Sequence, residues 1–358
     1  MKVGILTYHR ANNFGAVLQC YALQSCLEAC AYQVEVIDYR QPFTELAYKA
    51  VRWDIMRDAI NKPRLMAGYL VKVLPEKLKR ANKYNKFRNA YLKTSKVVKC
   101  ANDMPQDIDV FLIGSDQMWS LHCTGYTIDK IYFGEFPHHK NCKICGYAIS
   151  SNIQSLEQIG SEALTYYTNN FKILSFREEI IRDTVEKMTQ IHGRVDLDPS
   201  LLVDADVWQK LAAPRIVKQK YCLTYFLHDI DNEKEFNKHI NTFAQKRGCI
   251  VVDMFDIAFS PSAFLSAIMY ADCVISTSFH ATAFSVLFKK DFYSLTTNNG
   301  KDIRYINLLT ALGIPERVVG VNELVMFHSE KINYRKVYAN LNTLREQSKN
   351  YLKELANL

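Results

Sequence analysis

Residues Val274–Phe288 read Val-Ile-Ser-Thr-Ser-Phe-His-Ala-Thr-Ala-Phe-Ser-Val-Leu-Phe. The apolar and β-branched residues of Cys273–Ile275 predict a short buried strand. Apolar residues then recur at the spacing of a helix, at Ala283, Phe284, Leu287 and Phe288. A buried strand that leads through a short polar turn into a helix is typical of α/β folds, and we therefore expect an α/β protein.

The turn between this strand and this helix is rich in hydroxyl groups. The first turn of a helix carries unpaired N–H groups and the positive end of the helix dipole, so such a turn favours anions. We take Ser278, Phe279 and Thr282 as candidate ligand-binding residues. His280 is a candidate proton donor, because an imidazole titrates near neutral pH. The simpler interpretation is that Ser278 caps the helix and His280 packs at a domain edge.

Composition points to a soluble globular protein of two domains. The chain has 358 residues, of which 48% are hydrophobic and 23% charged. It contains no apolar run long enough to span a bilayer, and it opens on a strand pattern without a signal peptide. Its ten cysteines are scattered, several within apolar patterns, which indicates reduced thiols and a cytoplasmic location.

Polar residues follow the predicted strands of the N-terminal half. The strand at 3–7, the helix at 16–30 and the strand at 34–38 form one βαβ unit. Open α/β sheets bind ligands at the carboxyl ends of their strands. The candidate residues after the first strand are His9, Arg10, Asn12, Asn13 and Gly15. Either asparagine has a simpler role as the cap of the following helix.

Two more strands of this half also end in polar residues. The strand at 109–113 is followed by Ser115, Asp116 and Gln117, and the strand at 173–176 by Arg177. Asp116 is a candidate general base, and the arginine fork suits two-point binding of a carboxylate or phosphate. The simpler interpretations are a turn-capping aspartate and a salt bridge from Arg177 to a neighbouring glutamate. We expect one helix at 156–171 between these elements.

A second run of alternating strands and helices follows. We assign residues 1–205 to an N-terminal Rossmann-like domain and residues 206–330 to a C-terminal one, with the two sheets facing across a cleft. Helices are expected at 232–247, 262–270 and 303–312. The amphipathic segment at 331–358 is expected to form a helix that crosses back onto the first domain.

A basic insertion interrupts the N-terminal domain at about 42–100. It is expected to hold two or three helices, with breaks near Pro63 and Pro75. Val51–Cys100 contains fourteen Lys or Arg and three Asp or Glu, a net charge of +11 against +8 for the whole chain. Such a segment suits an anionic membrane surface or a phosphorylated acceptor, whereas no nucleic-acid-binding motif occurs. The alternative is a solvated helix face.

Several common site motifs are absent. The chain has no G-x-G-x-x-G, P-loop, G-x-S-x-G or H-E-x-x-H sequence. Cys142-x-x-Cys145 lacks a second pair at zinc spacing, and no metal site is expected.

Five motifs in this order resemble the polysaccharide pyruvyl transferase family. They cover roughly residues 1–320 and are Gly4–Gln19, Gly114–Trp119, Phe176–Glu179, Leu197–Leu202 and Ser278–Ser285. The resemblance implies a fold similar to the two-domain (GT-B type) glycosyltransferases. It also implies transfer of pyruvate from phosphoenolpyruvate to a sugar of a polysaccharide or of its lipid-linked precursor, as a cyclic ketal. In that family the matching histidine and arginine, here His280 and Arg177, serve donor binding and catalysis.

The residues agree with this chemistry. Phosphoenolpyruvate carries a carboxylate and a phosphate, which suit an arginine and a helix N-terminus. We expect Arg177 to bind one group and the turn at 278–282 the other, with phosphoenolpyruvate as a donor substrate and no cofactor. His280 is the expected proton donor with His9 as the second choice, and Asp116 the base for the attacking hydroxyl.

Two other functions remain open at this point. One is a glycosyltransferase that uses a nucleotide-sugar donor, because fold alone does not fix chemistry. The other is a non-catalytic anion-binding protein of a polysaccharide-assembly complex.

Overall fold

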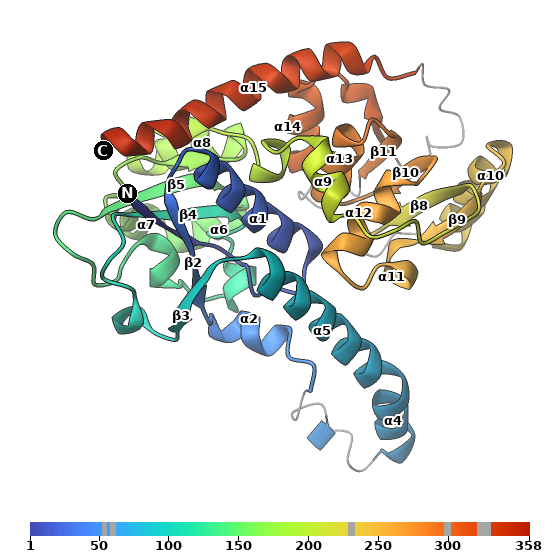
Figure 1. Cartoon of the computed structure of the whole chain (residues 1–358), viewed down its shortest axis with the longest axis horizontal. Helices are drawn as coiled ribbons and strands as arrows, with labels where there is room; N and C mark the ends of the chain where they lie inside the picture. Colours follow the sequence, from blue (N-terminus) through green and yellow to red (C-terminus); the bar gives the residue numbers. More distant parts are fainter. Residues whose placement is uncertain (52–55, 58–61, 228–232, 297–301, 321–330) are drawn as a thin grey trace.

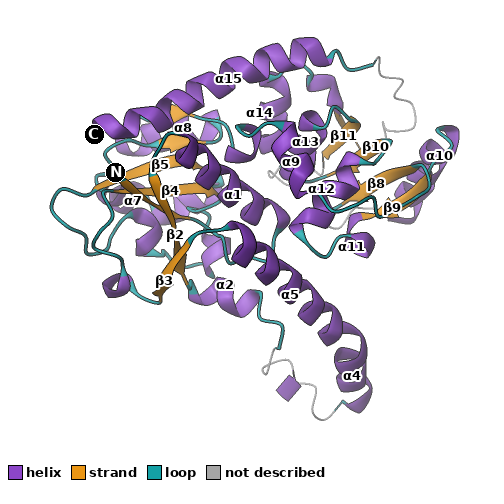
Figure 2. Ribbon diagram, viewed as in Figure 1, coloured by secondary structure: helices purple, strands orange, loops and turns teal. Residues whose placement is uncertain are grey.

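The computed structural model describes residues 1–51, 56–57, 62–227, 233–296, 302–320 and 331–358, and it contains two separate parallel sheets. Helices cover both (Figures 1 and 2). The predicted pair of Rossmann-like α/β domains is confirmed, because each sheet is built from parallel strands joined through helices.

The N-terminal sheet has the strand order β3-β2-β1-β4-β5-β6-β7. Strand β1 lies inside the sheet between β2 and β4, and its residues Val3, Ile5 and Leu6 are fully buried because helices cover both faces of the sheet. The strands are β1 (Lys2–Leu6), β2 (Gln33–Tyr39), β3 (Thr94–Val98), β4 (Val110–Asp116), β5 (Lys143–Ile149), β6 (Ser175–Phe176) and β7 (Arg194–Val195).

The C-terminal sheet has the order β12-β11-β10-β8-β9, with all pairs parallel. Its strands are β8 (Tyr221–Tyr225), β9 (Ile250–Asp253), β10 (Cys273–Ser276), β11 (Asp291–Thr296) and β12 (Val318–Gly320). Its helices are α9 (Ala205–Leu211), α10 (Glu233–Lys246), α11 (Met254–Ile257), α12 (Pro261–Met269), α13 (Phe279–Leu287) and α14 (Ile303–Ala311). The predicted start of the second of these helices at Asn232 lies outside the described residues.

Helix α1 (Phe14–Ala29) packs between the two domains and has buried residues on most of its surface (Figure 1). At its first turn, the Phe14 ring stacks on Phe264 of α12 with 4.7 Å between ring centroids. Phe14, Leu18, Trp208 and Phe284 belong to one apolar cluster that contains residues of both domains. The cleft is therefore closed at its base by a shared core, which fixes the facing strand ends relative to each other.

Helix α15 (Tyr334–Glu354) runs back from the C-terminal domain to the N-terminal sheet (Figure 1). Tyr351 stacks on Tyr147 at 5.7 Å and donates a hydrogen bond to the Gly146 carbonyl at 2.9 Å. The Arg345 guanidinium donates to the carbonyls of Leu201 and Val203. This helix is therefore a second connection between the domains.

The basic insertion projects from the N-terminal domain as α2 (Pro42–Ala47), α4 (Pro63–Gly68), the π-helix η1 (Tyr69–Val73) and α5 (Leu74–Tyr91) (Figure 1). The sequence predicted that a helix would end near Pro75, and this prediction is wrong. Pro75 lies in the first turn of α5, where its missing N–H costs no hydrogen bond, and the chain passes through a π turn instead.

Two more boundaries differ from the sequence prediction. The insertion ends earlier than 100, because Thr94–Val98 forms the edge strand β3 beside β2; its β-branched residues were the signal. The helix expected at 156–171 is two helices, α6 (Ile153–Ile159) and α7 (Ser161–Thr168). Gly160 joins them with φ 81°, a left-handed conformation that ends the first helix.

The remaining elements are short or peripheral. They are α8 (Glu179–Thr189) and the 3₁₀ turns η2 (Ala101–Asp103), η3 (Leu121–Thr124), η4 (Lys130–Phe133), η5 (Pro199–Leu201), η6 (Pro315–Arg317) and η7 (Leu355–Asn357). Among the described helices, none has the length and apolar character needed to cross a membrane.

Candidate functional site

The turn after β10 opens helix α13 at the domain boundary. Ser278 is the N-cap of this helix, and its Oγ accepts a hydrogen bond from the Ala281 N–H at 3.3 Å. The capping role considered from the sequence is therefore present. His280 is the second residue of α13 and so lies in the first turn, where backbone N–H groups have no partner within the helix.

His280 packs against the first turn of α1 from the other domain. A Cβ atom added to Gly15 would lie 2.0 Å from the Nδ1 atom of His280, far inside contact distance. Only glycine at position 15 lets the imidazole approach the α1 backbone this closely. Gly15 was predicted as a substrate-binding residue; the structure shows that it admits a side chain from the other domain.

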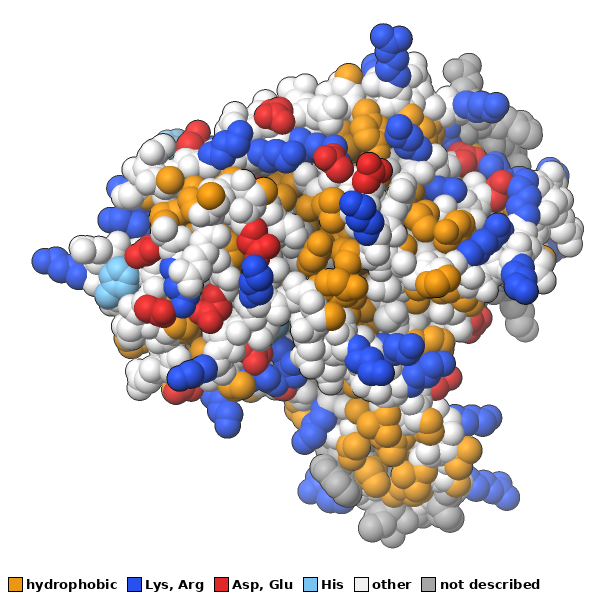
Figure 3. All heavy atoms as spheres, in the orientation of Figure 1, with side chains coloured by type: hydrophobic (Ala, Val, Ile, Leu, Met, Phe, Trp, Pro, Cys, Tyr) orange, Lys and Arg blue, Asp and Glu red, His pale blue; other side chains and the backbone are white. Residues whose placement is uncertain are grey.

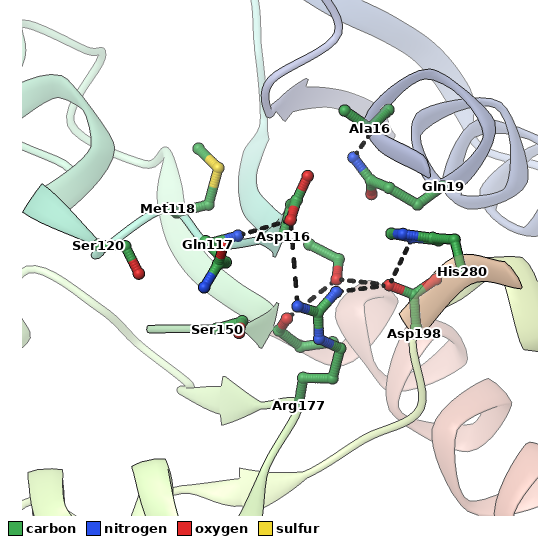
Figure 4. A network of polar contacts seen from close by, with 12 residues as sticks. Ala16, Gln19, Asp116, Gln117, Met118, Ser120, Ser150, Arg177, Asp198 and His280 are labelled. Atoms are coloured by element: carbon green, nitrogen blue, oxygen red, sulfur yellow. Dashed lines mark hydrogen bonds and ion pairs between the residues drawn. The ribbon is translucent and has the colours of Figure 1, made fainter. Parts of the chain in front are cut away.

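The Nε2 atom of His280 lies 3.6 Å from Oδ2 of Asp198 (Figure 4). The same carboxylate oxygen accepts a hydrogen bond from Arg177 Nη1 at 2.9 Å. Asp198 therefore joins the two residues that the sequence singled out from opposite domains. At 3.6 Å the His280 contact is an ion-pair distance rather than a hydrogen bond, and Nε2 has no hydrogen-bond partner among the described residues.

Asp198 is fully enclosed and held by the 3₁₀ turn that follows it. Its Oδ1 accepts hydrogen bonds from the backbone N–H and the hydroxyl of Ser200, at 2.9 and 2.6 Å. Burial alone would raise the pKa of Asp198, but the adjacent His280 and Arg177 outweigh it and hold the pKa well below its usual range. The carboxylate is therefore a permanent negative charge beside the imidazole.

Sequence reasoning quoted Asp198 within a motif but gave it no role. The available signal was its position shortly after the short strand β7, like that of the other polar residues at strand ends. What the sequence did not show is that Asp198 points to a histidine from the other domain.

Arg177 is buried and surrounded by carboxylates. Its Nε donates to Glu178 Oε1 at 3.0 Å, so the salt bridge to a neighbouring glutamate, which was the simpler interpretation of this residue, is present. Burial opposes its charge, yet Glu178, Asp198 and Asp116 raise its pKa further above the ordinary value. Its Nη2 lies 4.0 Å from Asp116 Oδ1 and has no hydrogen-bond partner among the described residues. This buried nitrogen is therefore the part of the fork that lacks a hydrogen-bond partner among the described residues.

Asp116 ends β4 in a conformation that L-residues rarely adopt. Its φ is 91°, and its Oδ1 accepts a hydrogen bond from the next backbone N–H, that of Gln117, at 2.9 Å. Such backbone strain persists only where surrounding contacts hold it, and it is concentrated at functional sites. The carboxylate faces the cleft, although one of its oxygens already has the turn-capping role considered above.

A cavity of about 340 Å³ lies between the facing strand ends. Seven of the predicted site residues line it: Asn13, Gly15, Asp116, Gln117, Ser278, Phe279 and His280. Tyr8, Tyr48, His122 and Arg304 are among its other lining residues. The volume suits a small ligand of the size of a sugar or a three-carbon phosphate.

A neighbouring cavity of about 330 Å³ contains Arg177 and Asp198 in its lining. The two cavities share Phe279 and Arg304. The Phe279 ring lies under the guanidinium of Arg177, with 4.7 Å from Cζ to the ring centroid. His280 and Arg177 thus face adjoining cavities and meet at Asp198.

Arg304 was missed by sequence reasoning. It is the second residue of α14 and lines both cavities. Burial lowers its pKa, and the nearby charge of Arg177 lowers it as well. No sequence motif includes this position. The one indication in the sequence was that Arg304 lies in the first turn of a helix predicted to follow a strand. It adds a second cation at the junction of the two cavities.

Several predicted residues lie outside the main cavity. His9 is buried, with its ring nitrogens 3.2 Å from the Thr7 carbonyl and 3.0 Å from Asp38 Oδ1. Burial would raise the pKa of Asp38, but His9 and Arg40 lower it to about 2. Arg10 pairs with Glu45 at 3.0 Å. This loop is therefore fixed to β2 and α2.

The other predicted residues bind within the fold. Asn12 accepts a hydrogen bond from Arg88 at 3.1 Å, and Asn13 caps α1. The Ser115 hydroxyl donates to the Ala148 carbonyl at 3.0 Å, and Thr282 Oγ1 lies 2.6 Å from the Ser294 hydroxyl. Among the described residues, no three His, Cys, Asp or Glu side chains gather in a way that would hold a metal ion.

Two facing Rossmann-like domains with a charged cluster at their strand ends define a two-domain α/β protein with its site in the cleft. The family model described as Polysaccharide pyruvyl transferase matches residues 13–299, which is more than half of the chain. The chain belongs to this family, as its motifs predicted. The matched range includes Gly15, Asp116, Arg177, Asp198 and His280.

Comparison with solved structures returns distant matches over nearly the whole chain. UDP-GlcNAc 2-epimerase from Methanocaldococcus jannaschii is 11% identical with a TM-score of 0.45, covering 97% of this chain and 100% of that one. The Rickettsia bellii UDP-N-acetylglucosamine 2-epimerase is 9% identical with a TM-score of 0.47, covering 99% and 98%. E. coli heptosyltransferase WaaC is 11% identical with a TM-score of 0.37, covering 96% and 100%. No curated protein matches the chain.

Proposed function

We propose that this protein transfers pyruvate from phosphoenolpyruvate to two hydroxyls of a sugar, forming a cyclic ketal and releasing phosphate. The observation that carries the proposal is the His280–Asp198–Arg177 contact, in which an imidazole and a guanidinium from different domains share one buried carboxylate. Membership of the pyruvyl transferase family supports it.

The donor's two anionic groups suit this cluster. The first turn of α13 offers backbone N–H groups and the positive end of the helix dipole to the phosphate. Arg304, which lines both cavities, adds a cation there. The buried Nη2 of Arg177, which has no hydrogen-bond partner among the described residues, is the natural partner of the carboxylate, and the Phe279 ring must move for the donor to reach it.

The reaction begins with proton transfer. His280 Nε2–H protonates the donor's methylene carbon, which makes C2 electrophilic, and the negative Asp198 stabilises the imidazolium before the transfer. A sugar hydroxyl adds to C2 and gives its proton to Asp116. The C2–O bond to phosphate then breaks, and the leaving phosphate takes the proton held by Asp116. A second hydroxyl adds to C2 and gives its proton to His280, which restores the imidazolium. We assign the first proton to His280 rather than His9, because both His9 ring nitrogens contact protein oxygens.

A donor screen tests this function against the two alternatives. The purified protein is incubated with a panel of sugar acceptors and either phosphoenolpyruvate or nucleotide sugars. Phosphate release from phosphoenolpyruvate that depends on an acceptor is the expected result. Nucleotide release would instead identify a glycosyltransferase, and the absence of both would favour a non-catalytic anion-binding protein.

We expect Gly15→Ala to lower kcat strongly, because the added methyl group would overlap the His280 imidazole and push it from Asp198. A misplacement of about 1 Å commonly costs on the order of 10²-fold in rate. The measurement is steady-state phosphate release together with the melting temperature. The matched control is Gly68→Ala, because a Cβ added at Gly68 meets nothing within 4 Å. Equal rates for Gly15→Ala and the native protein would show that the close contact does not serve catalysis.

The acceptor is proposed to be lipid-linked, with the protein at the inner face of the membrane. The end of the α4–α5 projection carries exposed apolar side chains bordered by Lys and Arg (Figure 3). Leu70, Val71, Val73 and Leu78 are 42%, 73%, 41% and 48% exposed. Exposed Lys72 and Lys79 lie beside them. Apolar side chains ringed by cations suit insertion into the headgroup region of an anionic bilayer.

We expect the double variant Leu70→Ser, Val71→Ser to lose binding to vesicles that contain anionic lipid, since less apolar area is buried in the interface. Activity on a lipid-linked acceptor should fall with it, whereas activity on a free sugar should stay unchanged. Co-sedimentation and parallel assays measure both. Tyr166→Ser, which removes an exposed side chain from α7, is the control. Equal loss on both acceptors would rule out a membrane role for this tip.

A further inference from the structure

A separate cavity of about 410 Å³ lies where α5 passes the loop after β1. It is lined by Arg10, Asn12, Glu45, Leu46, Tyr48, Lys49, Ala81, Asn85 and Arg88. Neither His280 nor Asp116 lines it, so it is distinct from the cavity described above. Tyr48 lines both cavities, which makes them neighbours.

Arg88 is a buried cation that forms no ion pair with any described residue. Its side chain donates to the Arg10 carbonyl at 3.3 Å and to the amide oxygens of Asn12 and Asn85 at 3.1 and 2.7 Å. All of these acceptors are neutral. Its Nε has no hydrogen-bond partner among the described residues, and Arg88 is only 5% exposed. Burying an unpaired charge costs free energy, so a bound anion beside Arg88 would be stabilising.

The charges around this cavity are positive overall. Arg10 and Lys49 line it together with Arg88, whereas Glu45 is the one carboxylate among the described lining residues. Glu45 is already paired, with Arg10 at 3.0 Å and Arg40 at 3.6 Å. Burial and the nearby Arg10 lower the pKa of Arg88 to about 10, which still leaves it charged at neutral pH. A multiply charged anion would compensate this excess.

We propose that this cavity binds the diphosphate that joins a lipid carrier to the sugar acceptor. The inference rests on the proposed function for the identity of the acceptor. Arg88 and Lys49, with Arg10 already shared with Glu45, suit two linked phosphates, and the shared Tyr48 places the attached sugar at the entrance to the catalytic cavity. One face of α5 carries Ala81, Asn85 and Arg88. The exposed apolar tip lies toward the N-terminal end of the same helix. Ten residues of helix separate Leu78 from Arg88, roughly 15 Å, so a lipid diphosphate at the membrane surface can reach the cavity.

Calorimetry with the full chain tests this without any turnover. The ligands are inorganic phosphate, inorganic diphosphate and farnesyl diphosphate, each titrated with and without saturating phosphoenolpyruvate. We expect both diphosphates to bind more tightly than phosphate, farnesyl diphosphate the tightest, and phosphoenolpyruvate to displace neither. Arg88→Met should raise the Kd for diphosphate by about tenfold or more, the loss of a charge-assisted contact.

Lys49→Ala provides a second variant, because Lys49 is exposed and its loss does not disturb the core. It should raise the Kd about threefold or more. Lys83→Ala is the control, since it removes an exposed cation from α5 that does not line the cavity. The proposal is overturned if diphosphate does not bind, binds no more tightly than phosphate, or binds equally to the native protein and both cavity variants. Displacement by phosphoenolpyruvate would also overturn it, because the cavity would then be the donor site. These outcomes are independent of the donor screen, so either proposal can fail alone.

Discussion

Replacing His280 with alanine is expected to lower ketal formation by roughly 10²–10⁴-fold, the usual contribution of a positioned general acid. The His280 side chain lines the main cavity, and its Nε2 lies beside the negative Asp198 with no hydrogen-bond partner among the described residues. It is thus placed to give a proton to a ligand. Phosphate release from phosphoenolpyruvate in the presence of acceptor measures the loss.

The control for this variant is His192→Ala. The His192 side chain is 91% exposed and its loss should leave the rate unchanged. Both variants should melt near the native temperature, since His280 donates no hydrogen bond to the protein through Nε2. Normal turnover in His280→Ala would remove the imidazole from the mechanism and leave His9 as the remaining predicted acid.

Arg177→Ala is expected to destabilise the fold by about 3–5 kcal/mol, the cost of breaking a buried ion pair by removing one partner. Its guanidinium binds Glu178 and Asp198, both almost fully buried, and their charges would face each other unpaired. Urea unfolding at neutral pH measures the change. Arg182→Ala is the matched control, because its partner Asp183 is exposed and the surface pair contributes little.

Donor binding is better tested with Arg177→Lys, which keeps the charge but loses the fork. We expect its affinity for phosphoenolpyruvate to fall by about 1.5–3 kcal/mol, the value of a charge-assisted hydrogen bond. If the folded Arg177→Lys variant binds phosphoenolpyruvate as tightly as the native protein, Arg177 does not bind the donor and only orients Asp198. An Arg177→Ala variant as stable as the native protein would contradict the buried ion-pair account itself.

The sequence predicted the architecture well because strand patterns and their polar ends recur in order. The histidine turn at the start of α13 and the polar end of β4 are local features, and the alternation of strands with helices predicts parallel sheets. The ends of helices and strands were less predictable where one residue type favours a different structure from that of its neighbours. Pro75 suggests a break, but a proline in a first turn is compatible with a helix, and the lysines at 93–99 obscured the edge strand β3.

The site was only partly predictable, because its contacts join residues far apart in sequence. Asp198 and His280 meet only when the domains pack, and Gly15 matters because of a side chain from the other domain. Arg304 carried no motif at all. His9, by contrast, looked like a site residue because it follows β1, yet its neighbours Thr7 and Asp38 bind its ring within the fold.

The central claim is best tested by mass analysis of the sugar formed with phosphoenolpyruvate in D₂O. If His280 delivers a solvent-exchanged proton to the donor's methylene carbon, the product gains one pyruvate less one water and carries one deuterium in its methyl group. His280→Ala run in parallel should give little of this product. An unmodified sugar from the native protein across the acceptor panel, or a ketal whose methyl group holds no deuterium, would contradict the account.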